Sequence, residues 1–203
     1  TAYHCYRWPH RTCYSFLKFK GFIKPMSFSL RSVSYSYVDP NNKTDEGGAI
    51  KGIHVDGLDI SPTGVTAIIG PSGSGKTTLL SILAGFIRPH LGESGHLRLG
   101  ETSFEAEGHA PGQVSFVFQS PFLLGAASNL TNVLQGRVAA SGNVGAEISP
   151  AEVRSIFRNL GLYSDQKMLV GKKSKSMSGG EAQRVAIARA LLTNPEVILC
   201  DEP

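Results

Sequence analysis

The sequence predicts an α/β domain with a mainly parallel sheet, and three observations lead to that prediction. A chain of 203 residues, 41% of them hydrophobic and 18% charged, can bury one sizeable core. Short β-branched apolar runs alternate with segments of helical character, as in βα units. One of these runs, at residues 65–69, leads into a glycine-rich loop and then into an apolar helical segment. A strand, a loop and a buried helix therefore follow one another.

The remaining elements follow from local patterning. We expect further strands at residues 29–35, 51–60, 96–99, 114–118 and 197–200. The helix after the glycine-rich loop is expected at 76–84, where Gly85 ends it. Two more helices are expected at 150–160 and 180–192. The first of these two opens with residues suited to the N-cap, first and third helical positions, namely Ser149, Pro150 and Glu152.

Residues 1–25 differ from the rest of the chain. They hold five basic residues, seven aromatic residues and no acidic residue. We expect Met26 to be the natural start, with residues 1–25 lying outside a domain that covers 26–203. Two alternatives stay open: an organellar targeting leader, or a zinc site whose candidate ligands match no paired spacing. Those candidates are His4, Cys5, His10 and Cys13.

The formal charge of +4 suggests a nucleic-acid or anionic-membrane partner at first sight. All five basic residues of segment 1–25 count toward it, which leaves fifteen basic against sixteen acidic residues, or −1, for 26–203. Bulk charge therefore predicts no nucleic-acid partner for the domain. Three cysteines do not make a disulfide framework.

The glycine-rich loop matches the pattern G-x-x-x-x-G-K-[ST] in full. Its glycines allow successive backbone N–H groups to face a polyphosphate, and the following helix adds its positive N-terminus. We expect Lys76 to reach the β- and γ-phosphates and the Thr77 hydroxyl to bind Mg²⁺, with Thr78 also among the nucleotide-binding residues. The matching residues are Gly70, Pro71, Ser72, Gly73, Ser74, Gly75, Lys76 and Thr77.

A pair of acidic residues follows the apolar strand at 197–200. Ligands of open parallel sheets bind at the carboxyl ends of the strands, where Asp201 and Glu202 lie. Adjacent residues on a strand point in opposite directions, so the two acids are expected to differ in role. We expect Asp201 to hold Mg²⁺, either directly or through another ligand, and Glu202 to be the base that polarises an attacking water.

Between these two motifs, residues 175–191 hold the run Ser178-Gly179-Gly180-Glu181 at the start of a predicted helix. With this run the chain resembles the nucleotide-binding domain of ATP-binding cassette (ABC) transporters, over about residues 27–203. The resemblance implies a P-loop NTPase (RecA-like) fold with an antiparallel β subdomain and a helical subdomain at about 120–176. It also implies ATP and Mg²⁺ as cofactors. Met177 and Glu181 depart from the usual Leu and Gln of the family.

The resemblance further implies roles for particular residues. Ser178, Gly179 and Gly180 would form a second phosphate cradle, which closes on the γ-phosphate held by Lys76 of a second subunit in a head-to-tail dimer. Gln119 matches the residue that senses the γ-phosphate and binds the metal. Two further positions compete for the aromatic residue that stacks on adenine, and Tyr37 is preferred to Tyr35.

The function implied is an ATPase subunit that powers transport of an unidentified solute through a separate permease, at the cytoplasmic face of a bacterial-type inner membrane. The alternatives are a soluble cassette ATPase acting on ribosomes or DNA, and a non-catalytic interaction module. Only 57 residues separate Gln119 from Met177, which leaves no room for the long coiled coils of chromosome-associated members. Glu202 argues against a degenerate site.

The family pattern continues beyond the acidic pair into a D-loop, a further strand and a switch histidine. None of the six histidines follows Glu202. We therefore expect the domain to be incomplete at the C-terminus, and the chain as it stands to bind nucleotide poorly and to hydrolyse little ATP.

Overall fold

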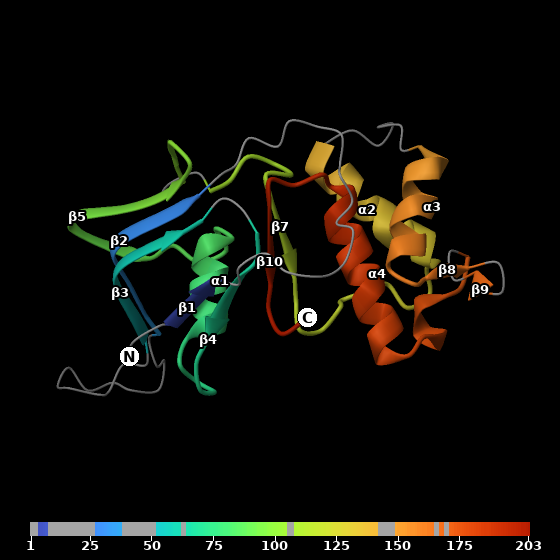
Figure 1. The fold of residues 1–203 in the computed structure, drawn as a ribbon, viewed down its shortest axis with the longest axis horizontal. Helices are drawn as coiled ribbons and strands as arrows, with labels where there is room; N and C mark the ends of the chain where they lie inside the picture. Colours follow the sequence, from blue (N-terminus) through green and yellow to red (C-terminus); the bar gives the residue numbers. More distant parts are fainter. Residues whose placement is uncertain are drawn as a thin grey trace. The chain divides into compact units, whose positions relative to one another are not determined.

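The computed structural model describes most of the chain, and the described residues belong to two compact units (Figure 1). The first unit is Thr1–Gly108 and the second is His109–Pro203. The described residues are 4–7, 27–37, 52–61, 64–104, 108–141, 149–164, 167–168 and 171–203.

The first unit contains a four-stranded antiparallel sheet with the order β3-β2-β5-β6. Its strands are β2 (Phe28–Ser36), β3 (Gly52–Ile60), β5 (His90–Leu99) and β6 (Thr102–Ser103). Along β2, Phe28 and Leu30 are buried in the alternating pattern of a strand, and a bulge between Arg31 and Val33 then shifts the register. Ser32 at the bulge has a φ of 46°, so that Val33 returns to the buried face.

A second, two-stranded sheet in this unit leads into the glycine-rich loop. Strand β4 (Thr66–Ile69) pairs antiparallel with β1 (His4–Arg7), so part of the segment at 1–25 lies against the first unit. Helix α1 (Lys76–Leu83) starts after the loop, and five of its eight residues are buried. Its side chains at Leu79, Ile82 and Leu83 are fully buried. A helix this short is stabilised mainly by burial of these side chains, because the intrinsic helix propensity of its residues contributes little.

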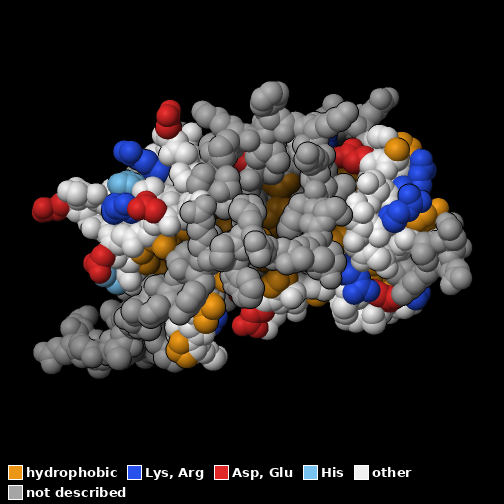
Figure 2. Space-filling view, viewed as in Figure 1, with side chains coloured by type: hydrophobic (Ala, Val, Ile, Leu, Met, Phe, Trp, Pro, Cys, Tyr) orange, Lys and Arg blue, Asp and Glu red, His pale blue; other side chains and the backbone are white. Residues whose placement is uncertain are grey.

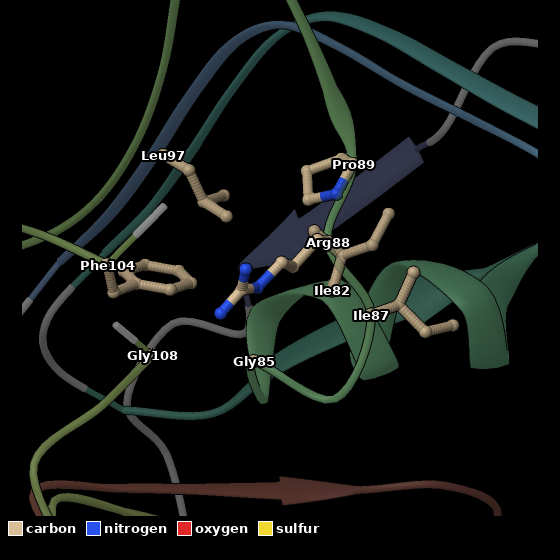
Figure 3. Close-up of a pocket in the computed structure, with 8 residues that line it drawn as sticks. All are labelled: Ile82, Gly85, Ile87, Arg88, Pro89, Leu97, Phe104 and Gly108. Carbon is tan, nitrogen blue, oxygen red and sulfur yellow. The ribbon is translucent and has the colours of Figure 1, made fainter. Parts of the chain in front are cut away.

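A small cavity of about 80 Å³ lies near the carboxyl end of α1 (Figure 3). The Arg88 side chain extends toward the Phe104 ring inside it. The glycine-rich loop is at the amino end of the same helix, so the cavity and the loop are separate features. The residues that line the cavity are Ile82, Gly85, Ile87, Arg88, Pro89, Leu97, Phe104 and Gly108.

The second unit combines a parallel strand pair with three helices. Strands β7 (Val114–Val117) and β10 (Val197–Cys200) run parallel in a register that pairs Val117 with Cys200. Helix α4 (Gly179–Leu192) packs against β7 and also against α2 (Asn129–Ser141) and α3 (Pro150–Asn159) (Figure 1). At Gly136 of α2 a Cβ atom would come within 2.7 Å of the Arg189 carbonyl oxygen, so only glycine allows α2 and α4 to approach this closely.

The region between Gln119 and the Ser178-Gly179-Gly180-Glu181 run also contains short elements. They are β8 (Tyr163–Ser164), β9 (Lys167–Met168) and the 3₁₀ turn η1 (Ser174–Ser176). Helix α3 opens as expected, because the Ser149 hydroxyl accepts a hydrogen bond from the Ala151 N–H and Pro150 begins the helix. Among the described residues, no helix is both long and apolar enough to cross a membrane.

The mixed α/β class and the antiparallel β part are confirmed by these elements. The mainly parallel sheet is represented in the described residues by β7 and β10 alone, because β4 belongs to the other unit and pairs there with β1. Strand β5 begins six residues before the expected start at residue 96. Its extension pairs with β2, as in Val33 with Leu91.

Candidate functional site

The glycine-rich loop joins β4 to α1 through backbone conformations that only glycine adopts easily. Gly73 has a φ of 76° and Gly75 a φ of 93°. Gly75 is also the N-cap of α1, and no side chain caps the helix there. At Gly70 a Cβ atom would lie 2.8 Å from the Ser74 hydroxyl oxygen. The backbone conformation therefore favours glycine at Gly73 and Gly75, while at Gly70 an added Cβ would require the Ser74 hydroxyl to move. The first turn of α1, which no side chain caps, leaves backbone N–H groups available to a ligand.

Lys76, the first residue of α1, is folded over this loop. Its ammonium group donates hydrogen bonds to the carbonyl oxygens of Gly70 at 3.0 Å and Pro71 at 2.9 Å. The positive charge is therefore held above the same backbone that turns its N–H groups toward a ligand. An anion with several oxygens, such as a polyphosphate, suits this combination of one cation and a helix N-terminus.

Thr77 and Thr78 follow Lys76 but differ in environment. Thr77 is exposed, and its carbonyl oxygen accepts a hydrogen bond from the Ser81 hydroxyl. Thr78 is only 6% exposed. Its hydroxyl lies 2.6 Å from the hydroxyl of Tyr37, the aromatic residue preferred at the adenine position. The structure thus brings Tyr37 to the first turn of α1.

In the second unit, Gln119 and Glu202 lie in contact. The Gln119 side-chain amide donates to a Glu202 carboxylate oxygen at 2.8 Å. Because β7 and β10 are parallel, their carboxyl ends meet at one edge, and the Asp201 N–H donates to the Val117 carbonyl there. Asp201 is partly buried and Glu202 is exposed, with a φ of 46°. The two acids thus differ in environment, and the different roles expected for them stay a prediction.

Side chains of α4 hold the segment on both sides of Gln119. Gln183 donates to the Phe118 carbonyl oxygen at 3.0 Å. Arg189 donates to the carbonyl oxygens of Pro121 and Phe122 at 2.9 and 3.0 Å. Burial lowers the pKa of the Arg189 guanidinium from its ordinary value. Sequence reasoning missed both α4 residues, which appear there only as polar positions in a helix of small apolar residues.

The Ser178 run forms a complete capping box at the start of α4. The Ser178 hydroxyl accepts from the Glu181 N–H at 3.3 Å, and the Glu181 carboxylate accepts from the Ser178 N–H at 3.0 Å. Glutamate at this position, noted above as a departure from the family, therefore has a structural role of its own. Gly179 and Gly180 form the first turn behind this cap.

A buried polar cluster joins the segment after Gln119 to the segment before Ser178. Asn129 and Asn132 are fully buried and Ser174 is 8% exposed. Asn132 bonds to the backbone N–H and carbonyl of Leu124 and donates to the Ser174 hydroxyl, which donates to the Asn129 amide oxygen. Sequence reasoning missed this cluster, because asparagine and serine are typical of loops.

The candidate residues thus fall into two groups. One group is the glycine-rich loop with Tyr37 in the first unit, and the other is Gln119, the acidic pair and Ser178 in the second. Of the three expected magnesium ligands, Thr77 belongs to the first group, and Gln119 and Asp201 belong to the second. All three offer an oxygen donor of the kind that Mg²⁺ prefers, so their chemistry fits this ion.

Comparison with known proteins relates this chain to the ATP-binding proteins of transport systems. The family described as "ABC transporter" matches residues 53–203. A phosphonates import ATP-binding protein of Bordetella parapertussis is 35% identical over 158 residues, covering 72% of this chain and 60% of that protein. An energy-coupling factor transporter ATP-binding protein of Malacoplasma penetrans is 34% identical over 178 residues, covering 87% of this chain and 56% of that protein.

Two further similarities agree. An L-cystine transport system ATP-binding protein of Escherichia coli is 37% identical over 164 residues, covering 74% of this chain and 61% of that protein. Among solved structures, cbiO1 from Clostridium perfringens, part of the ABC transporter complex cbiONQ, matches with a TM-score of 0.58 at 21% identity. That match covers 87% of this chain and 65% of cbiO1, and it shows the fold. The chain spans less than two thirds of the length of each of these proteins.

Proposed function

This chain belongs to the ABC transporter family, and on that premise we propose that it is part of an ATP-binding subunit that hydrolyses ATP to power solute transport. The observation that carries the proposal is the loop between β4 and α1, where Lys76 and the first turn of α1 suit a polyphosphate. The relatives described above are named as ATP-binding proteins of transport systems. None of these names supports the alternative of a ribosome- or DNA-acting ATPase.

Each group of residues has a defined part in the proposed reaction. Lys76 and the backbone N–H groups of the loop bind the β- and γ-phosphates, and Tyr37 stacks on adenine. Thr77 and Asp201 hold Mg²⁺, which neutralises charge on the phosphate oxygens. Glu202 accepts the proton of the attacking water, and its hydrogen bond with Gln119 orients the carboxylate.

The partners belong to the same proposal. A second copy or a related ATP-binding subunit pairs head to tail, so that the Ser178 run of each subunit faces the phosphate held by Lys76 of the other. A separate transmembrane permease carries the solute. The subunit is then a peripheral protein at the cytoplasmic face of the membrane, and no nucleic acid takes part.

Two substitutions in the full-length protein test binding and hydrolysis separately. We expect Lys76→Ala to weaken ATP binding by about 10- to 100-fold, because hydrogen bonds from a charged donor contribute about 1.5–3 kcal/mol. Glu202→Gln is expected to keep ATP affinity and to lower kcat by at least about 100-fold, as for loss of a general base. Titration with fluorescent ATP and a phosphate-release assay give the two quantities.

Arg98→Ala is the matched control, because it removes a cation from an exposed position on β5 of the same unit. Equal loss of ATP affinity in the Arg98 and Lys76 variants would contradict the assignment of Lys76. Undiminished hydrolysis by the Glu202→Gln protein would do the same for Glu202.

A further inference from the structure

Tyr37 is held at two points. Its ring meets the ring of Tyr35 edge-on, with centroids 5.0 Å apart and planes at 90°. Its hydroxyl oxygen lies 2.6 Å from the Thr78 hydroxyl oxygen, and either group could be the donor. The residue as a whole is still 46% exposed. An aromatic ring fixed in this way keeps a large area open to a ligand.

Thr78 is well suited to fix the far end of this ring. It is the third residue of α1, it follows Lys76 and Thr77 in the sequence, and it is buried. A threonine side chain in a helix is restricted mainly to two rotamers, so its hydroxyl has few directions available to it. The turn of α1 that follows the glycine-rich loop therefore also determines where the Tyr37 ring lies.

We propose that the Thr78 hydroxyl is a positioning group for Tyr37, which makes it part of the selection for a nucleotide base over a bare polyphosphate. A side chain that is ordered before the ligand arrives loses less conformational entropy on binding. Without the bond from Thr78, the Tyr37 ring has to be ordered by the base itself. The inference rests on the proposed function and assigns Thr78 to recognition of the base end of ATP.

Two ligands distinguish this role from a contact with phosphate. The affinities of the full-length protein for ribose-labelled fluorescent ATP and for inorganic tripolyphosphate, measured by competition, are compared among variants. We expect Thr78→Val and Tyr37→Phe each to weaken ATP by about three- to tenfold, the range for one side chain that must be ordered on binding. Tyr37→Phe should leave tripolyphosphate affinity within about twofold of the wild type, because it removes the bond without changing Thr78 or the glycine-rich loop.

Three further variants sharpen the comparison. Thr78→Ser keeps the hydroxyl and should keep ATP affinity. The double variant Thr78→Val/Tyr37→Phe should bind ATP no more weakly than either single variant, because all three lack the same bond. Tyr163→Phe is the matched control, since it removes the same atom from a tyrosine of the second unit and should change neither affinity.

Several outcomes would overturn the inference. If Thr78→Val weakened ATP and tripolyphosphate equally, Thr78 would act on the phosphates. If Tyr37→Phe, a mild change at a partly exposed residue, left ATP affinity unchanged, the hydroxyl bond would have no role in base binding. If the wild-type protein and the Lys76→Ala variant both bound neither ATP nor tripolyphosphate, that result would contradict the proposed function, and this inference would fail with it.

Discussion

The contact between Gln119 and Glu202 shows how strand register creates a site. Each residue could be predicted separately from its place after an apolar strand, but the contact between them depends on the parallel pairing of Val117 with Cys200. One residue of slip would separate the two side chains. The amide, as a neutral donor, stabilises the carboxylate without adding charge.

Replacing this amide by a carboxylate predicts a shift in pH dependence. In Gln119→Glu, two carboxyl groups would lie about as close as the present 2.8 Å contact, and repulsion between like charges would disfavour the state in which both are ionised. Because a general base acts in its ionised form, the acid limb of the kcat profile should move to higher pH. Phosphate release measured from about pH 5 to 9 would show this.

The control for that experiment is Gln113→Glu. Gln113 donates to Glu196 at 3.3 Å, so the substitution creates a similar pair of carboxyl groups just ahead of β10, far along the strands from Glu202. The profile of this variant should match the wild type. Identical profiles for all three proteins would show that Glu202 is not the titrating base.

At the scale of elements, the polar cluster of Asn129, Asn132 and Ser174 joins three segments of the second unit. It ties the start of α2 to Leu124 and to η1, which leads into the Ser178 run. Main-chain bonds reinforce it, from Ser174 to Ala127 and from Lys175 to Gly125. The segments on either side of it therefore behave as one piece.

Asn132→Ala should accordingly be strongly destabilising. It leaves the Leu124 backbone groups and the Ser174 hydroxyl without their buried partner, and we expect a loss of about 2–4 kcal/mol in the free energy of unfolding. Urea denaturation followed by circular dichroism measures it. Asn159→Ala, at an exposed position at the end of α3, should change stability by less than about 0.5 kcal/mol. Equal effects of the two would be inconsistent with a stabilising role for the cluster.

The elements themselves were largely predictable, and the exceptions have physical causes. Strands at 197–200 and 52–60 agree within a residue, because apolar runs and turn residues mark them. The first half of β5 was not predicted, since His90–Leu99 begins with two glycines among polar residues and becomes a strand only by pairing with β2. Helix α2 has almost no apolar stripe, and its packing on α4 depends on a glycine.

At the scale of the whole molecule, the excess of basic residues lies in the segment 1–25. Acidic and basic side chains occur side by side over the described surface drawn in Figure 2, in agreement with the near-neutral balance of residues 26–203. We therefore expect recognition of a polyphosphate by this chain to depend on one placed cation and oriented backbone groups. A broad basic surface is not needed.

This distribution predicts weak binding to DNA. Residues 26–203 should show no salt-dependent affinity for random-sequence duplex DNA, because few phosphates would be neutralised. Any weak binding by the whole chain should disappear when residues 1–25 are removed. Fluorescence anisotropy at low and physiological salt measures both proteins. Binding by residues 26–203 that weakens steeply with salt would contradict the prediction and restore a nucleic-acid function to consideration.

The bonds from Lys76 to Gly70 and Pro71 have a further consequence for ligand choice. The Lys76 ammonium group already donates two hydrogen bonds, to carbonyl oxygens at 3.0 and 2.9 Å. A ligand that binds to Lys76 must therefore take the place of these neutral acceptors. Hydrogen bonds to charged oxygens are roughly twice as strong as those to neutral ones, so the exchange favours a polyanion and gives a neutral ligand almost nothing. We therefore expect the loop to bind ligands with several charged oxygens in preference to neutral ligands, because only charged oxygens compete well with its own carbonyl groups.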